Sequence, residues 1–521
     1  MAASRSLESE ALETLDLANE TETAALARWL AGFTRAGDFV GLRGDLGAGK
    51  TAFARAYLRA LTGDPDLEAP SPTFTLIQTY DGPEFPVVHA DFHRLRGAEE
   101  LTQLGWEETL DGAVALVEWP ELAASALPAD RLEIALSFDP SRGVEFRRLE
   151  FIARGAMAAR FKLARAIESL LGGAGWAQAR RDPLHGDAST RAFERLTASD
   201  GRTAILMISP PRAGGPTLRF GKTYPEIARL SADIRAFVAM AEGLRSQGIS
   251  TPRIYALSLA DGLALLEDFG DETVAEAGVP NAPRYAEATS LIADLHRRDL
   301  PSELPVDGET YVVPTYDIEA MLIEVELALD WYAPAIARGN PSSGARMQFL
   351  SLWRDILTPV LAQPTTWTLR DYHSPNLHWL PDRDGLKRLG LIDFQDAVLG
   401  PPAYDVASLL QDARVAVPDD LELRLLAHYA RRRANADPDF DATAFTAAYS
   451  IMGAQRATKI LGIFTRLDRR DGKPQYLGHL PRIERTLAKN LKHPALETLR
   501  QWFETHLPRA LGTSSPPAEA P

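Results

Sequence analysis

The sequence of 521 residues contains no cysteine and no long hydrophobic run. The absence of cysteine excludes disulfide bonds, thiolate metal ligands and a cysteine nucleophile. Arg, Asp or Gly interrupts every apolar stretch well short of the roughly 20 residues that span a bilayer. The acidic N-terminus also lacks the basic and apolar plan of a signal peptide. We therefore expect a cytoplasmic protein that makes no membrane contact.

Basic residues are scarce in the first part of the chain. Residues 1–150 hold 26 Asp and Glu against 13 Lys and Arg, so they carry most of the net charge of -15. Because Lys and Arg drive binding to nucleic acid phosphates, we do not expect this region to hold nucleic acid by itself. The chain is too long for one ordinary core, and the uneven charge indicates a domain boundary, which we place near residue 155.

Glycine is concentrated where the chain reads Gly-Asp-Leu-Gly-Ala-Gly-Lys-Thr, between a strand expected at 38–42 and a helix expected from 51 onward. Glycines allow backbone N–H groups to turn toward phosphate oxygens, and the helix N-terminus adds positive potential. Lys50 would reach the β and γ phosphates of ATP, and the hydroxyl of Thr51 would bind Mg²⁺. The expected phosphate-binding residues are Gly44, Asp45, Gly47, Ala48, Gly49, Lys50 and Thr51.

Two acidic residues end apolar strands further along the same region. Asp91 ends a strand expected at 87–92, and Glu118 ends one expected at 114–120. Since ligands of α/β proteins bind at the carboxyl ends of strands, these acids are expected beside Mg²⁺ or the attacking water. The proline-containing loop before the strand that Asp91 ends carries Thr73, a candidate for a threonine that responds to the bound nucleotide.

Four motifs, in order, carry a resemblance: Gly-Asp-Leu-Gly-Ala-Gly-Lys-Thr, Ser-Pro-Thr-Phe-Thr-Leu, Asp-Phe-His-Arg-Leu and Val-Glu-Trp-Pro. Together they resemble the TsaE family, the ATPase of bacterial tRNA threonylcarbamoyladenosine synthesis. The resemblance implies an α/β P-loop NTPase domain over residues 1–155, with the TsaB and TsaD proteins as partners and tRNA as an indirect one. His93 departs from the tyrosine usual in that family. The site residues implied are Lys50, Thr51, Thr73, Asp91, Glu118 and Trp119.

A second chemical centre lies in residues 369–377 and 389–396. A loop Asp followed by Asn, and then a hydrophobic strand that ends in Asp-Phe, is the arrangement of kinases. Asp371 would accept the proton of the attacking hydroxyl, while Asn376 and Asp393 would hold Mg²⁺. The alternative is a polar loop beside a buried strand with a capping Asp.

These residues resemble the aminoglycoside phosphotransferase and choline kinase superfamily, with Leu-Arg-Asp in place of the usual His-Gly-Asp. The variant loop and the stretch 459–466 are similar to the AmgK kinases. That likeness implies an α+β protein-kinase-like domain over 158–508 that phosphorylates the C1 hydroxyl of an aminosugar, N-acetylmuramate or N-acetylglucosamine. The alternatives are a regulatory module without useful turnover, or a kinase of an amino alcohol or aminoglycoside. The small-residue tail 511–521 is expected to be disordered.

One superfamily feature is missing. The strand expected at 203–208 has Met207 where a phosphate-pairing lysine is usual. The α and β phosphates must then be neutralised by other groups, and the loop 186–191, with Ser189 and Arg191, or Mg²⁺ are the candidates. A hairpin turn explains the small polar residues of this loop equally well.

Overall fold

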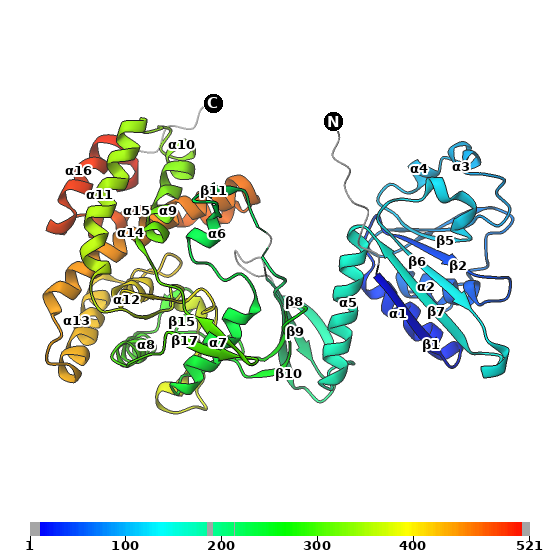
Figure 1. Ribbon diagram of the computed structural model, residues 1–521, viewed down its shortest axis with the longest axis horizontal. Coiled ribbons are helices and arrows are strands. Elements are labelled where there is room, and N and C mark those ends of the chain that lie inside the picture. The colour runs from blue at the N-terminus through cyan, green and yellow to red at the C-terminus, as the bar shows by residue number, and fades with distance from the viewer. Residues whose placement is uncertain (1–10, 185–190, 213, 513–521) are drawn as a thin grey trace. The chain divides into compact units, whose positions relative to one another are not determined.

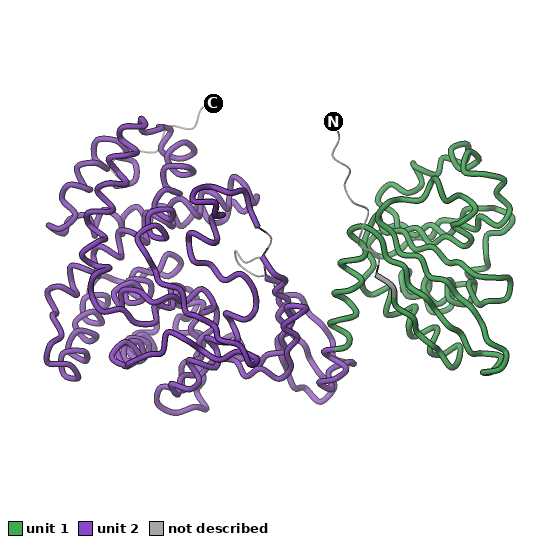
Figure 2. The backbone as a smooth tube through the Cα atoms, in the orientation of Figure 1, with its two compact units in different colours: residues 1–169 green, residues 170–521 purple. Residues whose placement is uncertain are grey.

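The computed structural model describes residues 11–184, 191–212 and 214–512, and the chain forms two compact units, residues 1–169 and 170–521 (Figures 1 and 2). The boundary between the units falls inside one helix, α5 (Ala156–Gly173). The domain limits 1–155 and 158–508 therefore stay a prediction. Ser189 and most of the tail 511–521 lie outside the described residues. Across the described ranges, no helix is long and apolar enough to cross a membrane.

Unit 1 is built on a seven-stranded mixed sheet in the order β1-β7-β6-β2-β5-β4-β3. β2 pairs in parallel with β5 and β6, and β4 pairs in parallel with β5, whereas β1, β3 and β7 join antiparallel. The strands are β1 (Ala11–Leu17), β2 (Phe39–Arg43), β3 (Ile77–Asp81), β4 (Pro86–Asp91), β5 (Val114–Glu118), β6 (Arg131–Ser137) and β7 (Arg147–Arg154). The other helices are α1 (Glu20–Phe33), α2 (Lys50–Thr62), α3 (Glu99–Gln103) and α4 (Trp106–Thr109).

Both faces of this sheet are covered. Successive strand residues point to opposite faces, and along β5 Val114 and Leu116 enter one core while Ala115 and Val117 enter the other. The first core includes residues of α1, α2 and the start of α5, and the second includes residues of α3 and α4. Strands buried on both faces explain why β5 is continuously apolar in sequence.

Unit 2 begins with a five-stranded antiparallel sheet in the order β13-β14-β10-β9-β8. Its strands are β8 (Arg180–Leu184), β9 (Ala192–Thr197), β10 (Thr203–Ile208), β13 (Ile254–Ser258) and β14 (Leu263–Glu267). Helix α7 (Ile234–Ser246) shares a core with this sheet, and that core includes the fully buried Met207. Paired short strands are β11 (Thr217–Arg219) and β12 (Lys222–Thr223), β15 (Ala275–Glu276) and β16 (Val279–Pro280), β17 (Glu303–Val306) and β18 (Glu309–Val312), β19 (Thr366–Thr368) and β22 (Val398–Gly400), β20 (Leu377–Trp379) and β21 (Leu389–Leu391).

The rest of unit 2 is mainly helical, and Figure 1 shows its last helices gathered away from the five-stranded sheet. The 30-residue helix α14 (Ala442–Asp471) runs through the core of this part and buries more than half of its residues. The other helices are α6 (Tyr224–Ile227), α8 (Ala282–Leu295), α9 (Ile318–Leu327), α10 (Ala333–Ala335), α11 (Ser343–Leu361), α12 (Ala403–Leu410), α13 (Asp419–Ala436), α15 (Leu480–Asn490) and α16 (Glu497–His506).

A glycine allows α14 to approach α9 closely. A Cβ atom built on Gly462 would lie 2.3 Å from the carbonyl carbon of Leu327 and 2.5 Å from its oxygen. Gly462→Ala should therefore lower the stability of unit 2 by about 1–3 kcal/mol, the usual cost of overpacking. Calorimetry of the full chain would show a lower melting temperature for the transition of unit 2.

Gly344, in the first turn of α11, is the matched control, because a Cβ there would meet only the Ser342 hydroxyl at 3.9 Å. Gly344→Ala should leave stability unchanged or raise it by up to about 1 kcal/mol. Equal melting temperatures for the Gly462 and Gly344 variants would contradict the close packing of α14 on α9.

Two candidate catalytic sites

The loop between β2 and α2 has the backbone of a phosphate site. Gly44, Gly47 and Gly49 adopt left-handed conformations, with φ of 135°, 83° and 103°. A Cβ atom at Gly44 would lie 2.2 Å from the carbonyl oxygen of Leu136, so this position also needs glycine for space. Among the described residues no side chain caps the N-terminus of α2, which leaves its first N–H groups available to an anion.

Lys50 is folded back onto its own loop. Its buried Nζ donates to the carbonyl oxygens of Gly44 at 2.6 Å and Asp45 at 3.0 Å, and it lies 3.9 Å from the ring centroid of Trp119. Burial lowers the pKa of Lys50, and the nearby Glu118 carboxylate opposes that shift. A triphosphate would offer the ammonium a stronger partner than two carbonyls.

The two acids expected at strand ends lie side by side. Asp91 and Glu118 are partners in the parallel pairing of β4 and β5, next to the strand that leads into the phosphate loop. Thr51 Oγ1 donates to Glu118 Oε2 at 3.3 Å, and Thr73 Oγ1 donates to Asp91 Oδ2 at 2.8 Å. The structure therefore gathers Lys50, Thr51, Thr73, Asp91 and Glu118 in one place.

Two further residues of this site were not identified from the sequence. His89 is fully buried, and its Nε2 lies 3.1 Å from Glu118 Oε1, within hydrogen-bond distance. Ser71 Oγ donates to Asp91 Oδ2 at 2.5 Å. The sequence could have indicated His89, because it stands two residues before Asp91 in one strand and its side chain therefore lies on the same face of the sheet. The ring of His93 lies tilted against that of Trp119, with centroids 5.0 Å apart.

In unit 2 the predicted base, Asp371, and the predicted metal ligands, Asn376 and Asp393, also come together. Asn376 Nδ2 donates to the carbonyl oxygen of Asp371 at 3.0 Å and to Asp393 Oδ2 at 3.4 Å. Burial and the neighbouring Asp393 carboxylate raise the pKa of Asp371. Phe394 stacks on Phe237 of α7, with ring centroids 5.2 Å apart, and this contact fixes the residue beside Asp393. The loop and the strand-end acid thus form one site.

Arg191 reaches this site from the strand side of unit 2. Its guanidinium donates to Asp393 Oδ1 and to Gln395 Oε1, both at 2.5 Å. Burial alone would raise the pKa of Asp393, but Arg191 and the hydrogen bond from Gln395 together outweigh it and the pKa is lowered. Met207 is fully buried in the core of the unit. Arg191 therefore places a positive charge beside Asp393.

A buried ionic cluster behind the catalytic loop was not foreseen from the sequence. Arg370 donates to Glu324 Oε1, and Lys459 Nζ lies 2.8 Å from the same oxygen. Asp405 accepts the backbone N–H groups of Leu369 at 2.6 Å and Arg370 at 2.9 Å. Burial alone would raise the pKa of Glu324, but its two cations outweigh it and the pKa is lowered. The cluster fixes the backbone just before the catalytic aspartate.

The donor sets suit Mg²⁺. Within the described ranges no group of three or more His, Cys, Asp or Glu side chains gathers as a metal site. Mg²⁺ in nucleotide enzymes needs fewer, because it takes one or two protein carboxylates together with phosphates and water. Asp91 with Thr51, and Asp393 with Asn376, each supply such a set of hard oxygen donors.

The fold and the sites define an enzyme that joins an α/β P-loop NTPase unit to an α+β protein-kinase-like phosphotransferase unit. Residues 17–145 match the family model described as "Threonylcarbamoyl adenosine biosynthesis protein TsaE", and residues 181–445 match the one described as "Phosphotransferase enzyme family". The chain belongs to the TsaE family through unit 1 and to the phosphotransferase enzyme family through unit 2. The predicted fold class is thereby confirmed, and both families use ATP.

Curated proteins similar to each half are known. The N-acetylmuramate/N-acetylglucosamine kinase of Caulobacter vibrioides is 39% identical over 346 residues, which are 64% of this chain and 94% of that protein. The kinase of the same name from Pseudomonas aeruginosa is 33% identical over 60% of this chain and 85% of its own length. The tRNA threonylcarbamoyladenosine biosynthesis protein TsaE of Rickettsia felis is 43% identical over 23% of this chain and 71% of its own length.

Glu324→Gln should destabilise unit 2 strongly, because it removes the buried carboxylate that pairs with Arg370 and with the partly buried Lys459. Breaking a buried ion pair from one side costs about 3–5 kcal/mol. Calorimetry of the full chain would show the transition of unit 2 at a much lower temperature.

Glu319→Gln, on the same helix α9, is the matched control. Its carboxylate pairs with Arg354 at 2.7 Å on the surface, where an ion pair contributes less than about 1 kcal/mol. If the two variants melt alike, the cluster does not stabilise the catalytic loop.

Proposed function

We propose that the chain is bifunctional. Unit 1 hydrolyses ATP in the synthesis of tRNA N6-threonylcarbamoyladenosine, together with TsaB and TsaD proteins, and contacts tRNA only through them. Unit 2 transfers a phosphoryl group from ATP to the C1 hydroxyl of N-acetylmuramate or N-acetylglucosamine, a step of cell-wall recycling. The observation that carries the kinase proposal is the position of Asn376, whose amide donates both to the backbone carbonyl of Asp371 and to the carboxylate of Asp393.

In unit 2, Asp371 accepts the proton of the sugar C1 hydroxyl as that oxygen attacks the γ phosphorus. The new O–P bond forms as the bond to the β-phosphate oxygen breaks, and ADP leaves with that electron pair. Asn376 and Asp393 would hold Mg²⁺, which neutralises charge on the phosphates. Arg191 moves from Asp393 to the phosphate oxygens, in place of the absent lysine. Ser189 is a further phosphate ligand in this proposal.

In unit 1, Lys50 exchanges its two loop carbonyls for the β and γ phosphates, and the N–H groups of residues 44–51 surround them. Thr51 and Asp91 would hold Mg²⁺, and Thr73 is held at the site by its hydrogen bond to Asp91. Glu118 accepts a proton from the attacking water, and His89 fixes the orientation of that carboxylate. Trp119 covers the lysine from the other side.

The rival proposals for unit 2 receive less support. A regulatory module without turnover has no need of an amide that bonds both to the loop of the proposed base and to the proposed metal carboxylate, as Asn376 does. An acceptor such as an amino alcohol or aminoglycoside is cationic. The two similar kinases are instead named for aminosugar substrates, N-acetylmuramate and N-acetylglucosamine.

Lys50→Ala should abolish ATP hydrolysis by unit 1, because no other side chain of the loop can reach the β and γ phosphates with a charge. The assay uses the full chain in an Asp371→Asn background without sugar, so that unit 2 contributes no turnover. In a strain that lacks its own TsaE, the same variant should fail to restore the modified nucleoside, as measured by mass spectrometry of tRNA digests. Lys162→Ala, an exposed lysine of α5, is the control. Persistent hydrolysis in the Lys50 variant would refute the assignment.

Asp371→Asn should reduce sugar phosphorylation by about 10²-fold or more, the usual contribution of a positioned base. The KM for sugar should change much less, since the lost group acts on the transition state. Initial rates with N-acetylmuramate and with N-acetylglucosamine measure both constants, and the exposed Asp382→Asn is the control. ATP hydrolysis by unit 1 should stay unchanged. A chain in which this variant also silences unit 1 would not contain two separate sites.

A further inference from the structure

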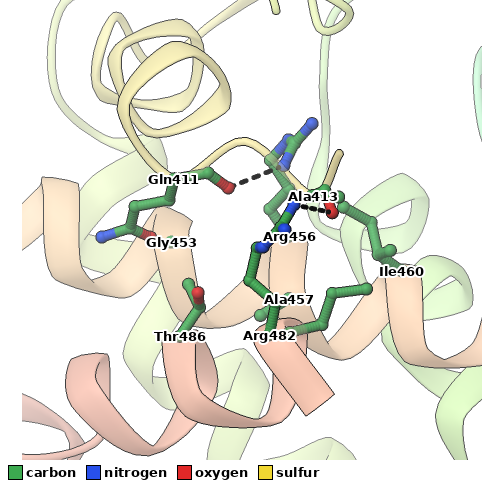
Figure 3. Close-up of a pocket in the computed structure, with 9 residues that line it drawn as sticks. Gln411, Ala413, Gly453, Arg456, Ala457, Ile460, Arg482 and Thr486 are labelled. Atoms are coloured by element: carbon green, nitrogen blue, oxygen red, sulfur yellow. Dashed lines mark hydrogen bonds between the residues drawn. The ribbon is translucent and has the colours of Figure 1, made fainter. Parts of the chain in front are cut away.

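A pocket lies beside the catalytic loop of unit 2, between α14, α15 and the chain that follows α12 (Figure 3). It has about 250 Å³ of empty volume, part of it open to solvent. Its lining includes Gln411 and Ala413 from the loop that follows α12, Arg456 from α14 and Arg482 from α15. None of these residues takes part in the catalytic steps described above.

The two arginines of this pocket donate to backbone carbonyl oxygens. Arg456 is only 6% exposed and donates to the carbonyl oxygen of Gln411 at 3.5 Å, while Arg482 donates to that of Ala413 at 3.1 Å. In the described part of the chain neither forms an ion pair with a carboxylate, although Arg370 in the same unit does. Burying a charge without a partner is costly, and a guanidinium fork fits a carboxylate in two parallel bonds.

The wall of the pocket touches the catalytic loop directly. Asp412, between the two lining residues of the loop, accepts the N–H of Ser374 at 3.0 Å. Arg414 donates to His373 Nε2 at 3.4 Å, and that nitrogen lies 3.9 Å from Asp371 Oδ1. The loop that lines the pocket is thus joined to Asp371 through His373.

We infer that Arg456 and Arg482 bind the carboxylate of an acidic acceptor sugar, the lactyl arm of N-acetylmuramate. This inference rests on the proposed kinase function and adds to it a device for choosing between acceptors. N-acetylglucosamine has a plain hydroxyl where N-acetylmuramate has the arm, so the pocket acts on one sugar and not on the other. The arm is attached at the sugar O3, away from C1, and thus can enter the pocket while the C1 hydroxyl faces Asp371.

Arg482→Gln tests the inference, because Arg482 is partly exposed and its loss leaves the core of the unit intact. The KM for N-acetylmuramate should rise by about ten- to a hundredfold, the value of a lost hydrogen bond to a charged group. The KM for N-acetylglucosamine should stay within about twofold, and kcat for both sugars should change little. Arg482→Lys keeps the charge but not the forked guanidinium, so its KM for N-acetylmuramate should lie between those of the unmodified chain and of Arg482→Gln. Arg485→Gln, an exposed arginine one turn further along α15, is the control and should match the unmodified chain.

Each other outcome has a defined meaning. Equal loss with both sugars would show that Arg482 only supports the loop 411–414, and would overturn the inference. An unchanged KM for both sugars would overturn it too, with the kinase function intact. An unmodified chain that phosphorylates neither sugar would refute the proposed function itself, and the inference with it. The buried Arg456→Gln is a second variant, and its soluble form should show the same selective loss.

Discussion

A buried charge must find an opposite charge or a set of dipoles, and both sites of this chain depend on how that need is met. Lys50 bonds to carbonyls of its own loop, Arg191 bonds to Asp393, and Arg456 and Arg482 bond to carbonyls of one loop. A carbonyl oxygen is a weaker partner for a cation than the anion of a substrate is. The Asp393 carboxylate, in contrast, would compete with that anion for Arg191. In the proposed function, these cations exchange their present partners for phosphate or carboxylate.

The backbone supports this arrangement at a few strained positions. Trp119, Arg370 and Asp393 are non-glycine residues in the left-handed region, with φ of 59°, 65° and 59°. Each is, or directly adjoins, a carboxylate of a proposed site. Such conformations cost of order 1–3 kcal/mol and persist only where surrounding contacts impose them. Here the contacts include the Asp405 carboxylate, which holds the amides of Leu369 and Arg370.

Much of the fold was predictable because its signals are local. The phosphate loop is one continuous motif, and the acids at 91 and 118 follow from the rule that parallel strands present their carboxyl ends to a ligand. The contacts that the sequence did not reveal join distant segments: Arg370 meets Glu324 46 residues away, and Arg191 meets Asp393 202 residues away. The sequence predicts that Met207 stands where a lysine is usual, but the contact of Arg191 with Asp393 could be seen only in the tertiary structure. The position of Arg482 in a pocket was also not predictable, because its sequence context is that of an exposed helix residue.

The central claim is that unit 2 transfers phosphate to the anomeric hydroxyl of an aminosugar. Two-dimensional ³¹P–¹H NMR of the product tests it directly, after incubation of the full chain with ATP, Mg²⁺ and N-acetylmuramate. The account predicts a phosphorus nucleus coupled to the anomeric proton of the sugar. Coupling to the protons at C6, or release of ADP without any sugar phosphate, would contradict it.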